Sequence, residues 1–304
     1  MASGVIPREA GAGGAATLRA AYQHCEAVTR RSGSSFASAF WMLPGEKRRA
    51  LHAIYAFCRL ADDIADDPEL RADREMLLER WRLELERAYL GKSRHPVGIA
   101  LGDAVHRFRL PELLFAELLQ GVESDLRGER PQTFEELRRY CHRVASTVGL
   151  LLVRVLGYKH PRSLEYAEAM GIAVQLTNVL RDVGADAAAG RVYLPGEDLA
   201  HFGLGPSDLE RPSRSDGLRL LLALTAERAR LYYERAEALL PDEDRRRLRA
   251  AEAMGRIYRA LLEELSRRGF PSGRDPVRLS RPRRLAIAVS VWLGAGRVAA
   301  RGRP

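Results

Sequence analysis

Apolar residues recur every three to four positions along most of the chain, which is the spacing of one face of an α-helix. No segment alternates β-branched and polar residues as a half-buried strand would, and no βαβ rhythm appears. The pattern therefore predicts an all-α protein. Its helices are expected over residues 17–31, 45–67, 69–90, 96–108, 111–127, 133–157, 161–184, 215–240, 242–268 and 282–298.

The chain is expected to form one domain, because no polar linker divides it near its middle. The helical domain is assigned to residues 17–280. Residues 1–16 are rich in glycine and alanine and are predicted to form a flexible tail, whereas residues 281–304 form a separate basic and apolar segment. Residues 187–214 contain several glycines and prolines and are predicted to be an irregular segment that covers the mouth of a site.

Two of the predicted helices carry polar residues at i, i+4, i+7 and i+11, a spacing that places them on one narrow helix face. The first polar stripe consists of Tyr55, Arg59, Asp62 and Asp66. The second consists of Gly171, Gln175, Asn178 and Asp182, and Asp186 extends it by one turn. Each stripe therefore ends in aspartates that are spaced i, i+4.

A charged stripe on a helix usually faces solvent, and the neighbouring residues decide whether that holds here. Phe57, Leu60 and Ile64 lie roughly opposite the first stripe, so most of that helix is apolar around a narrow polar seam. Such a seam is expected to face the interior of a helical bundle. Carboxylates that cluster there need compensating positive charge, and Arg59 and Arg181 on these two helices are too few to supply it.

Divalent metal is the expected compensation, and the residue types indicate which metal. Di-iron carboxylate bundles use Glu-x-x-His pairs, and neither stripe contains glutamate or histidine. Sites built from aspartate oxygens suit Mg²⁺, which keeps water ligands and bridges to substrate phosphates. The stripes therefore predict Mg²⁺, with Mn²⁺ as the alternative ion, and diphosphate chemistry.

The net charge of +9 is concentrated at the end of the chain. Residues 267–304 contain ten arginines and one acid, so residues 1–266 are neutral overall. The arginines flank the apolar segment Leu285–Leu293, which is too short to span a bilayer. Two interpretations stay open: peripheral contact with an anionic membrane, or a last core helix with a solvated tail. A nucleic-acid partner is not expected, because no aromatic or groove-reading element accompanies the arginines.

Cysteine content and the start of the chain bear on location. The three cysteines are scattered without a CxxC pair, which is typical of a reducing compartment and not of a disulfide framework. Residues 1–16 lack the basic start and apolar run of a signal peptide. The protein is therefore expected in the cytoplasm, with peripheral contact at the inner face of the membrane as the further expectation.

Several segments, taken in order, resemble the squalene/phytoene synthase family of trans-isoprenyl diphosphate synthases. Ser32–Phe36 resembles a serine-rich segment that contacts phosphate, and Tyr55–Asp66 resembles the first aspartate-rich helix. Tyr140–Gly149 resembles the helix that lines the substrate cavity. Gln175–Asp186, followed by Gly190–Pro195, resembles the second aspartate-rich motif and its loop. Ala185 departs from the family pattern, which often has glutamate there, but the spacing of the aspartates is kept.

The resemblance implies a helical bundle of the isoprenoid-synthase type around a central cavity, and a role for each matching residue. Its implied metal ligands are Asp62, Asp66, Asn178, Asp182 and Asp186, and its implied catalytic residues are Tyr55, Arg59, Asp62, Asp66, Asp182 and Asp186. Its implied substrate-binding residues are Ser35, Phe36, Tyr55, Arg59, Tyr140, Val144, Gly149, Gln175, Asn178, Arg181, Arg191 and Tyr193. Simpler roles remain open for two of them, since Tyr140 would also suit a core aromatic and Ser35 a helix cap.

The resemblance also implies a reaction, the head-to-head condensation of two isoprenyl diphosphates. Arg30–Pro44 looks most like the squalene-branch enzymes of the hopanoid pathway, which join two farnesyl diphosphates as presqualene diphosphate. A phytoene synthase that uses geranylgeranyl diphosphate is the alternative within the family. A non-catalytic helical protein that docks on membranes is the alternative outside it. NADPH is not expected, because no GxGxxG follows a strand.

Overall fold

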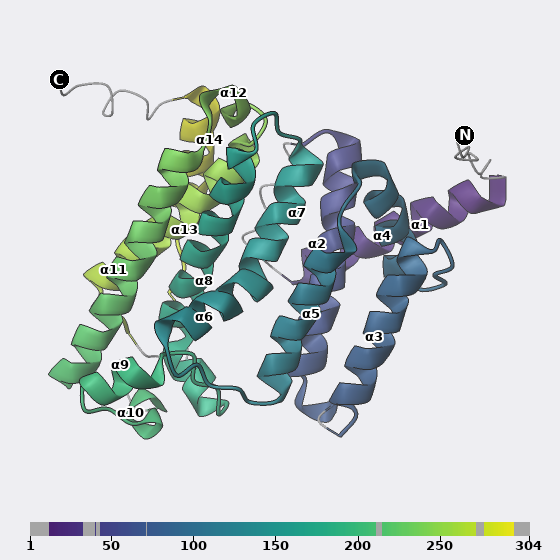
Figure 1. Ribbon diagram of the computed structural model, residues 1–304. Helices are drawn as coiled ribbons and strands as arrows, with labels where there is room; N and C mark the ends of the chain where they lie inside the picture. The colour runs from purple at the N-terminus through teal and green to yellow at the C-terminus, as the bar shows by residue number, and fades with distance from the viewer. Residues whose placement is uncertain are drawn as a thin grey trace.

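The structure is a computed structural model that describes residues 12–32, 40, 43–70, 72–210, 215–271 and 277–294. All regular structure within these ranges is helical, and no strand occurs in them (Figure 1). The predicted all-α class is therefore confirmed. None of the helices in the described ranges is long and apolar enough to cross a membrane.

Long helices lie side by side across the molecule, and short helices cap both ends (Figure 1). The longer helices are α1 (Ala12–Arg31), α2 (Gly45–Asp66), α3 (Arg74–Tyr89), α4 (Pro96–Phe108), α5 (Glu112–Leu126), α7 (Thr147–Leu156), α8 (Arg162–Ala188), α11 (Asp216–Leu239), α13 (Arg249–Arg267) and α14 (Arg281–Leu293). The shorter ones are η2 (Pro68–Leu70), α6 (Phe134–Cys141), η3 (His142–Ser146), α9 (Gly196–His201), α10 (Pro206–Glu210) and α12 (Asp242–Arg245). α9 and α10 lie at the end of the bundle where α8 ends, and α12 lies at the other end.

The structure corrects several predicted boundaries. The helix predicted over 133–157 is divided into α6, the π-helix η3 and α7, and the one predicted over 242–268 is divided into α12 and α13. α8 continues to Ala188, four residues past its predicted end, because Ala185, Ala187 and Ala188 favour the helix. The segment predicted to be irregular contains α9 and α10. α1 begins at Ala12, within the predicted tail.

Side-chain hydrogen bonds fix two of the helix starts. Thr133 begins α6 by accepting a hydrogen bond from the backbone N–H of Glu136. Asp244 of α12 is fully buried and accepts bonds from the backbone N–H groups of Lys159 and His160 and from the hydroxyl of Ser163. The short helix α12 is thereby tied to the start of α8.

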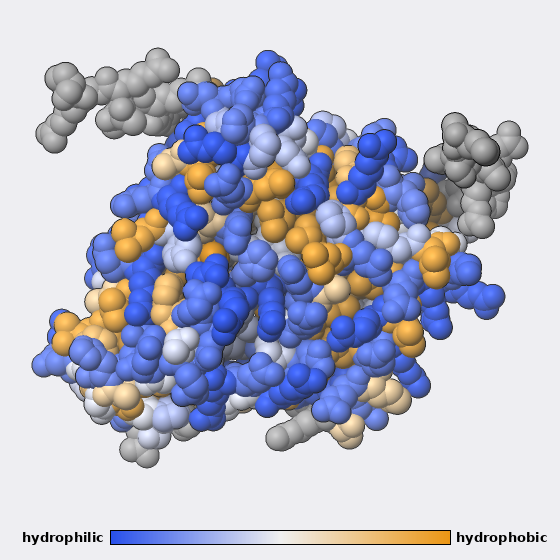
Figure 2. Space-filling model, viewed as in Figure 1, coloured by the Kyte–Doolittle hydropathy of each residue, from blue (hydrophilic) through white to orange (hydrophobic). Residues whose placement is uncertain are grey.

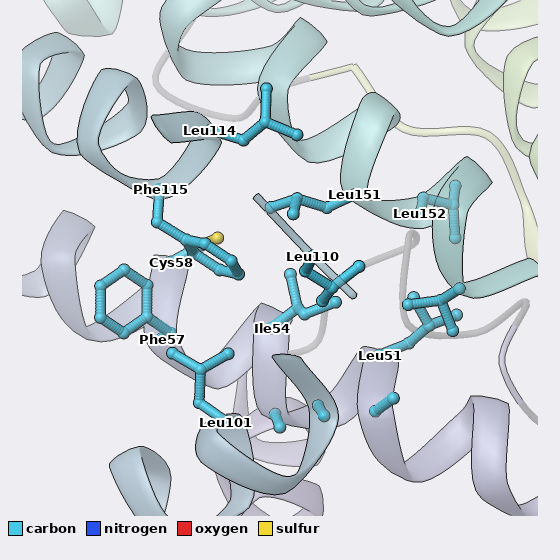
Figure 3. Close-up of a cluster of buried hydrophobic side chains, with 14 of the residues drawn as sticks. Leu51, Ile54, Phe57, Cys58, Leu101, Leu110, Leu114, Phe115, Leu151 and Leu152 are labelled. Carbon is cyan, nitrogen blue, oxygen red and sulfur yellow. The ribbon is translucent and has the colours of Figure 1, made fainter. Parts of the chain in front are cut away.

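The apolar core contains two clusters. The first surrounds α2 and includes Leu51, Phe57, Leu101, Phe115 and Leu151, whose side chains converge in Figure 3. The second joins α8 to α11 and α13. Burial of these side chains supplies the main favourable free energy of folding. The face of the molecule in Figure 2 is mostly hydrophilic, with apolar side chains in scattered patches.

Two glycines bring the π-helix η3 close to its neighbours. A Cβ atom on Gly171 of α8 would lie 2.4 Å from the Cα of Ser146, and one on Gly121 of α5 would lie 2.5 Å from a methyl carbon of Val144. Any larger residue would push η3 away from α5 or α8. The two glycines therefore set the position of Val144 and Ala145, which line the cavity described next.

Candidate active site

Two cavities of about 260 Å³ each meet inside the bundle between α2 and α8. One has a polar lining, and it includes the aspartates of both stripes. The other has a mostly apolar lining from α2, α5, η3, α7, α8 and α13. The two cavities share four lining residues, namely Asp62, Val122, Gln175 and Asn178. A ligand with a charged head and an apolar tail would fit this pair of cavities.

The first stripe contributes Asp62 and Asp66 to the polar cavity. Asp66 accepts a hydrogen bond of 2.7 Å from Arg191, which also donates to the backbone carbonyl of Ala65. Asp62 has no ion pair or side-chain hydrogen bond among the described residues. Its carboxylate is open to the cavity but recessed among protein atoms, and this desolvation, together with the charge of Asp66, raises its pKa to about 7.

The other two members of the first stripe lie outside the polar cavity. Arg59 forms an ion pair of 2.5 Å with Asp63, on the same helix, and lines neither cavity. Tyr55 lines the apolar cavity, and its hydroxyl donates to the hydroxyl oxygen of Ser32 over 2.9 Å. The stripe therefore does not act as one unit, because only its two aspartates reach the polar cavity.

The second stripe lies across the polar cavity on α8. Arg181 holds both carboxylate oxygens of Asp182, one of them over 2.8 Å. Asp186 has no ion pair or side-chain hydrogen bond in the described part of the chain, and burial and the charge of Asp182 raise its pKa to about 7. Asn178 donates to Gln175 over 3.2 Å, but its buried carbonyl oxygen has no hydrogen-bond partner there.

A third acidic position, Asp125 of α5, was not predicted from the sequence. It lines the polar cavity and accepts hydrogen bonds from the hydroxyls of Tyr140 (3.0 Å) and Tyr193 (2.8 Å), whose rings are stacked 4.9 Å apart. Burial raises its pKa to about 6, although both tyrosines stabilise the charged form. Its spacing from Leu118 and Val122 is a signal that could have revealed it, because an acid on an apolar helix face needs a partner.

The donor set fits a divalent cation that also binds a phosphate. Asp62 and Asp186 have no ion pair or side-chain hydrogen bond with any described residue, and the buried oxygen of Asn178 is a neutral oxygen ligand that has no hydrogen-bond partner among them. Within the described ranges, no group of three or more acidic, histidine or cysteine side chains is arranged to hold a metal ion by itself. Such an ion would therefore complete its shell with water and diphosphate oxygens, as Mg²⁺ commonly does.

Most of the residues predicted from the sequence are brought together. The polar cavity is lined by Asp62, Asp66, Tyr140, Gln175, Asn178, Arg181, Asp182, Asp186, Arg191 and Tyr193. The apolar cavity is lined by Tyr55, Val144 and Gly149, and by the four residues that it shares with the polar one. Arg59 is the predicted residue that lines neither. Ser35 and Phe36 lie outside the described residues.

Comparison with known proteins identifies the family of this chain. The sequence profile of the squalene/phytoene synthase family matches residues 29–283. A 15-cis-phytoene synthase from Synechococcus elongatus is 38% identical over 234 residues, which cover 73% of this chain and 76% of the relative. A presqualene diphosphate synthase from Rhodopseudomonas palustris is 35% identical over 257 residues, which cover 84% of this chain and 91% of the relative.

Solved structures share the fold as well. A dehydrosqualene synthase crystallised with a ligand superimposes with a TM-score of 0.81 and 30% identity, covering 91% of this chain and 97% of that structure. A squalene synthase from Alicyclobacillus acidocaldarius superimposes with a TM-score of 0.75 and 30% identity, covering 84% of this chain and 97% of that structure. The resemblance found in the sequence is thus confirmed. The chain belongs to the squalene/phytoene synthase family and is a prenyltransferase.

Proposed function

We propose that the protein condenses two molecules of farnesyl diphosphate head to head into presqualene diphosphate, with release of one diphosphate, as a step toward squalene and hopanoids. The observation that carries this proposal is the pair of aspartate walls on α2 and α8, which face one polar cavity at the mouth of an apolar one. A diphosphate head would lie between the walls, and its isoprenoid tail would enter the apolar cavity.

Asp62, Asp66, Asn178, Asp182 and Asp186 would hold Mg²⁺, or Mn²⁺, against the diphosphates. The ion would supply positive charge to the departing diphosphate, so that the allylic carbon–oxygen bond can break. Arg181 and Arg191 line the same cavity, and their guanidinium groups add fixed positive charge and hydrogen-bond donors for phosphate oxygens. Both arginines are already oriented by their bonds to Asp182 and Asp66.

The apolar cavity would protect the carbocation that remains after diphosphate leaves. Val144, Val148 and Gly149 contribute aliphatic and backbone surface to its lining that carries no nucleophile, and water is excluded once tails fill it. The double bond of the second substrate then attacks the cation, a carbon–carbon bond forms, and a proton is lost as the cyclopropane ring closes. NADPH is not part of this step.

A phytoene synthase that joins two geranylgeranyl diphosphates is the second candidate, and the identity to phytoene synthases of 38% and 34% favours it. The resemblance of Arg30–Pro44 to squalene-branch enzymes and the presqualene diphosphate synthase relative favour farnesyl diphosphate. The test is diphosphate release with each substrate in Mg²⁺ and in chelator. Mg²⁺-dependent release with farnesyl diphosphate is expected. Release only with geranylgeranyl diphosphate would contradict the substrate, and no release with either would contradict the enzyme function.

The proposal includes contact with a membrane, through an exposed apolar face of α14. This face consists of Leu285, Val289, Trp292 and Leu293, which are 36–77% exposed and lie on one side of the helix. Arg278 and Arg281 are exposed beside the start of α14. Apolar and basic groups together fit the surface of an anionic bilayer at the inner face of the cytoplasmic membrane, whereas a second copy of the chain would oppose arginine to arginine.

The position of α14 suits a product that is a lipid. It packs on α13, whose Ala251, Met254 and Tyr258 line the apolar cavity. Sedimentation with vesicles of phosphatidylglycerol and phosphatidylcholine tests the contact. Val289→Asp is expected to lower binding about tenfold or more, whereas Leu231→Asp on α11 replaces a similarly exposed leucine and leaves it unchanged. Equal binding of both variants, or of pure phosphatidylcholine vesicles, would contradict the contact.

A further inference from the structure

The length of the apolar cavity can be estimated separately from its lining residues on α8 and from those on α2. On α8 it extends from Asn178 to Tyr166, twelve residues that span about 18 Å at 1.5 Å per residue. On α2 it extends from Asp62 to Leu51, eleven residues that span about 17 Å. In both helices the acidic end is the C-terminal one. The cavity is therefore a pocket about 17–18 Å deep behind the aspartates.

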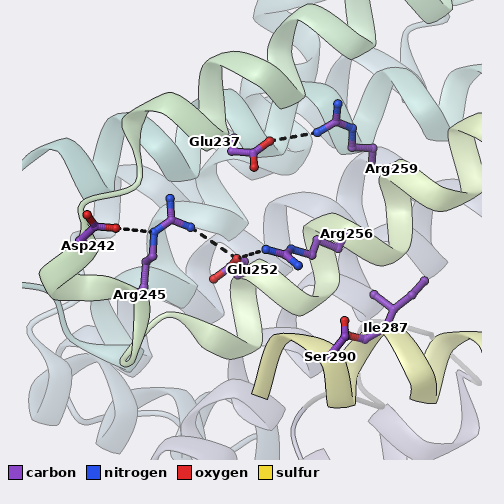
Figure 4. A network of polar contacts seen from close by, with 8 residues as sticks. All are labelled: Glu237, Asp242, Arg245, Glu252, Arg256, Arg259, Ile287 and Ser290. Carbon is purple, nitrogen blue, oxygen red and sulfur yellow. Dashed lines mark hydrogen bonds and ion pairs between the residues drawn. The ribbon is translucent and has the colours of Figure 1, made fainter. Parts of the chain in front are cut away.

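Tyr166 has the largest side chain at the end of this pocket that lies farthest from the aspartates. It is 1% exposed, and its hydroxyl is buried without a hydrogen-bond partner in the described part of the chain. The charges of Glu252, Arg245 and Arg256 act on that hydroxyl, and these three residues form a network of ion pairs across α12 and α13 (Figure 4). The tyrosine thus lies between the apolar pocket and a charged wall.

This depth distinguishes the two candidate substrates. Each isoprene unit extends the chain by four carbon–carbon bonds of about 1.5 Å, which advance about 5 Å in an extended zigzag. A farnesyl chain has three units and needs about 15 Å, whereas a geranylgeranyl chain has four and needs about 20 Å. The shorter chain fits in front of Tyr166. The longer one would have to displace the ring or enter the charged network.

We propose that Tyr166 is a specificity-determining residue, which limits the isoprenoid tail in this pocket to three units. This inference rests on the proposed function and goes beyond it by naming the residue that sets the chain length. Tyr166 is not a catalytic residue, because it lies at the far end of the pocket from the aspartates. Its ring separates the apolar chain end from the charged wall, which would otherwise be exposed to the pocket.

Three substitutions test the length limit. Tyr166→Leu shortens the side chain and keeps it apolar, and Tyr166→Met does so with a flexible chain that fills irregular space. Tyr166→Phe keeps the ring and its length. Tyr233→Leu is the matched control, because Tyr233 is as deeply buried on α11 but lines neither cavity. The measured quantity is the ratio of kcat/KM for geranylgeranyl diphosphate to that for farnesyl diphosphate, from diphosphate release in Mg²⁺.

The wild-type protein is expected to favour farnesyl diphosphate. Tyr166→Leu and Tyr166→Met are expected to raise the ratio about tenfold or more, and Tyr166→Phe and Tyr233→Leu to keep it within about threefold. If Tyr166→Leu or Tyr166→Met still releases diphosphate from farnesyl diphosphate but its ratio is unchanged, the length limit is overturned. The proposed function stays intact in that case. A wild-type preference for the longer substrate would also overturn the length limit. No release by the wild-type protein with either substrate would instead overturn the proposed function.

Discussion

α2 and α8 carry aspartates at the same spacing, yet the two helices hold them differently. On α8, Arg181 binds the aspartate that follows it directly in the sequence, Asp182. On α2, Arg59 binds Asp63 outside the cavity, and Asp66 is bound instead by Arg191, which lies beyond the end of α8. Equal spacing therefore places carboxylates on one face without fixing their partners.

The comparison also reveals a common feature. Each wall has one aspartate bound by an arginine, Asp66 or Asp182, and one without such a partner among the described residues, Asp62 or Asp186. Both of the latter carboxyls have a pKa raised to about 7 by burial and a neighbouring aspartate. The two neighbouring aspartates of each wall can both be ionised at low cost only if a positive charge binds beside them. Divalent metal and substrate binding would supply it.

The largest expected effect comes from removing a carboxylate of either wall. Asp62→Ala and Asp182→Ala are each expected to lower Mg²⁺-dependent diphosphate release at least about 10³-fold, because the charge on the leaving diphosphate is no longer stabilised. Helical content from circular dichroism is expected to stay nearly unchanged. Asp63→Ala is the control, since Asp63 is the next residue on α2 but lines neither cavity. Retained release in either wall variant, or an equal loss in the control, would contradict the role of the walls.

Arginine substitutions test whether the walls depend on Arg191 more than on Arg59. Arg191→Met is expected to lower diphosphate release about 10²-fold, because it removes both a phosphate donor and the bond to Asp66. Arg59→Met is expected to cost about tenfold or less, since Arg59 forms its ion pair outside the polar cavity. Steady-state kinetics of both variants measures the difference. A larger loss for Arg59→Met would show that this arginine leaves Asp63 to bind substrate.

The two tyrosines that donate to Asp125 are expected to have a smaller effect. Tyr140→Phe and Tyr193→Phe each remove a hydrogen bond that stabilises the charged carboxylate, so the pKa of Asp125 is expected to rise further above about 6. The acidic limb of the pH–rate profile should then move to higher pH, with about a tenfold loss at pH 7 or less. An acidic limb that does not move would contradict a role for ionised Asp125.

The smallest expected effect is on stability without metal. Asp62 and Asp186 have a folded-state pKa of about 7, whereas an unfolded aspartate has one of about 3.9. Their contribution to stability is present below pH 4 and is lost as pH rises through 7. In chelator, the melting temperature should fall from pH 6 to pH 8. The Asp62→Asn, Asp186→Asn double variant should show a fall smaller by about 2 °C or more. An identical fall in both proteins would contradict these pKa shifts.

Much of the fold was predictable because apolar periodicity marks long helices reliably. The points at which a predicted helix is divided into shorter ones were harder to predict. The division at η3 depends on the fit of Ser146 against Gly171, which belongs to another helix. The separate short helix α12 is held by Asp244, whose carboxylate accepts bonds from the α7–α8 loop. Neither contact leaves a periodic signal in the local sequence.

The site shows the same limit. The aspartate walls were predictable, since a narrow polar seam on an otherwise apolar helix is typical of a helix that faces a polar site inside a bundle. The pairing of Arg59 with Asp63 was not, because helix spacing allows either Asp62 or Asp63 and packing decides between them. Asp125 was missed because a single acid near a helix end is usually solvated, and only the fold brings Tyr140 and Tyr193 to it.

The central claim is that the two walls bind a diphosphate together with a divalent cation. It is tested most directly by titrating the protein with farnesyl thiolodiphosphate, which does not readily release its diphosphate, in Mg²⁺ and in chelator by calorimetry. We expect binding at least about 100-fold tighter in Mg²⁺, with this difference lost in the Asp62→Asn, Asp186→Asn variant. Equal affinity with and without Mg²⁺, or an undiminished Mg²⁺ effect in the variant, would contradict the claim.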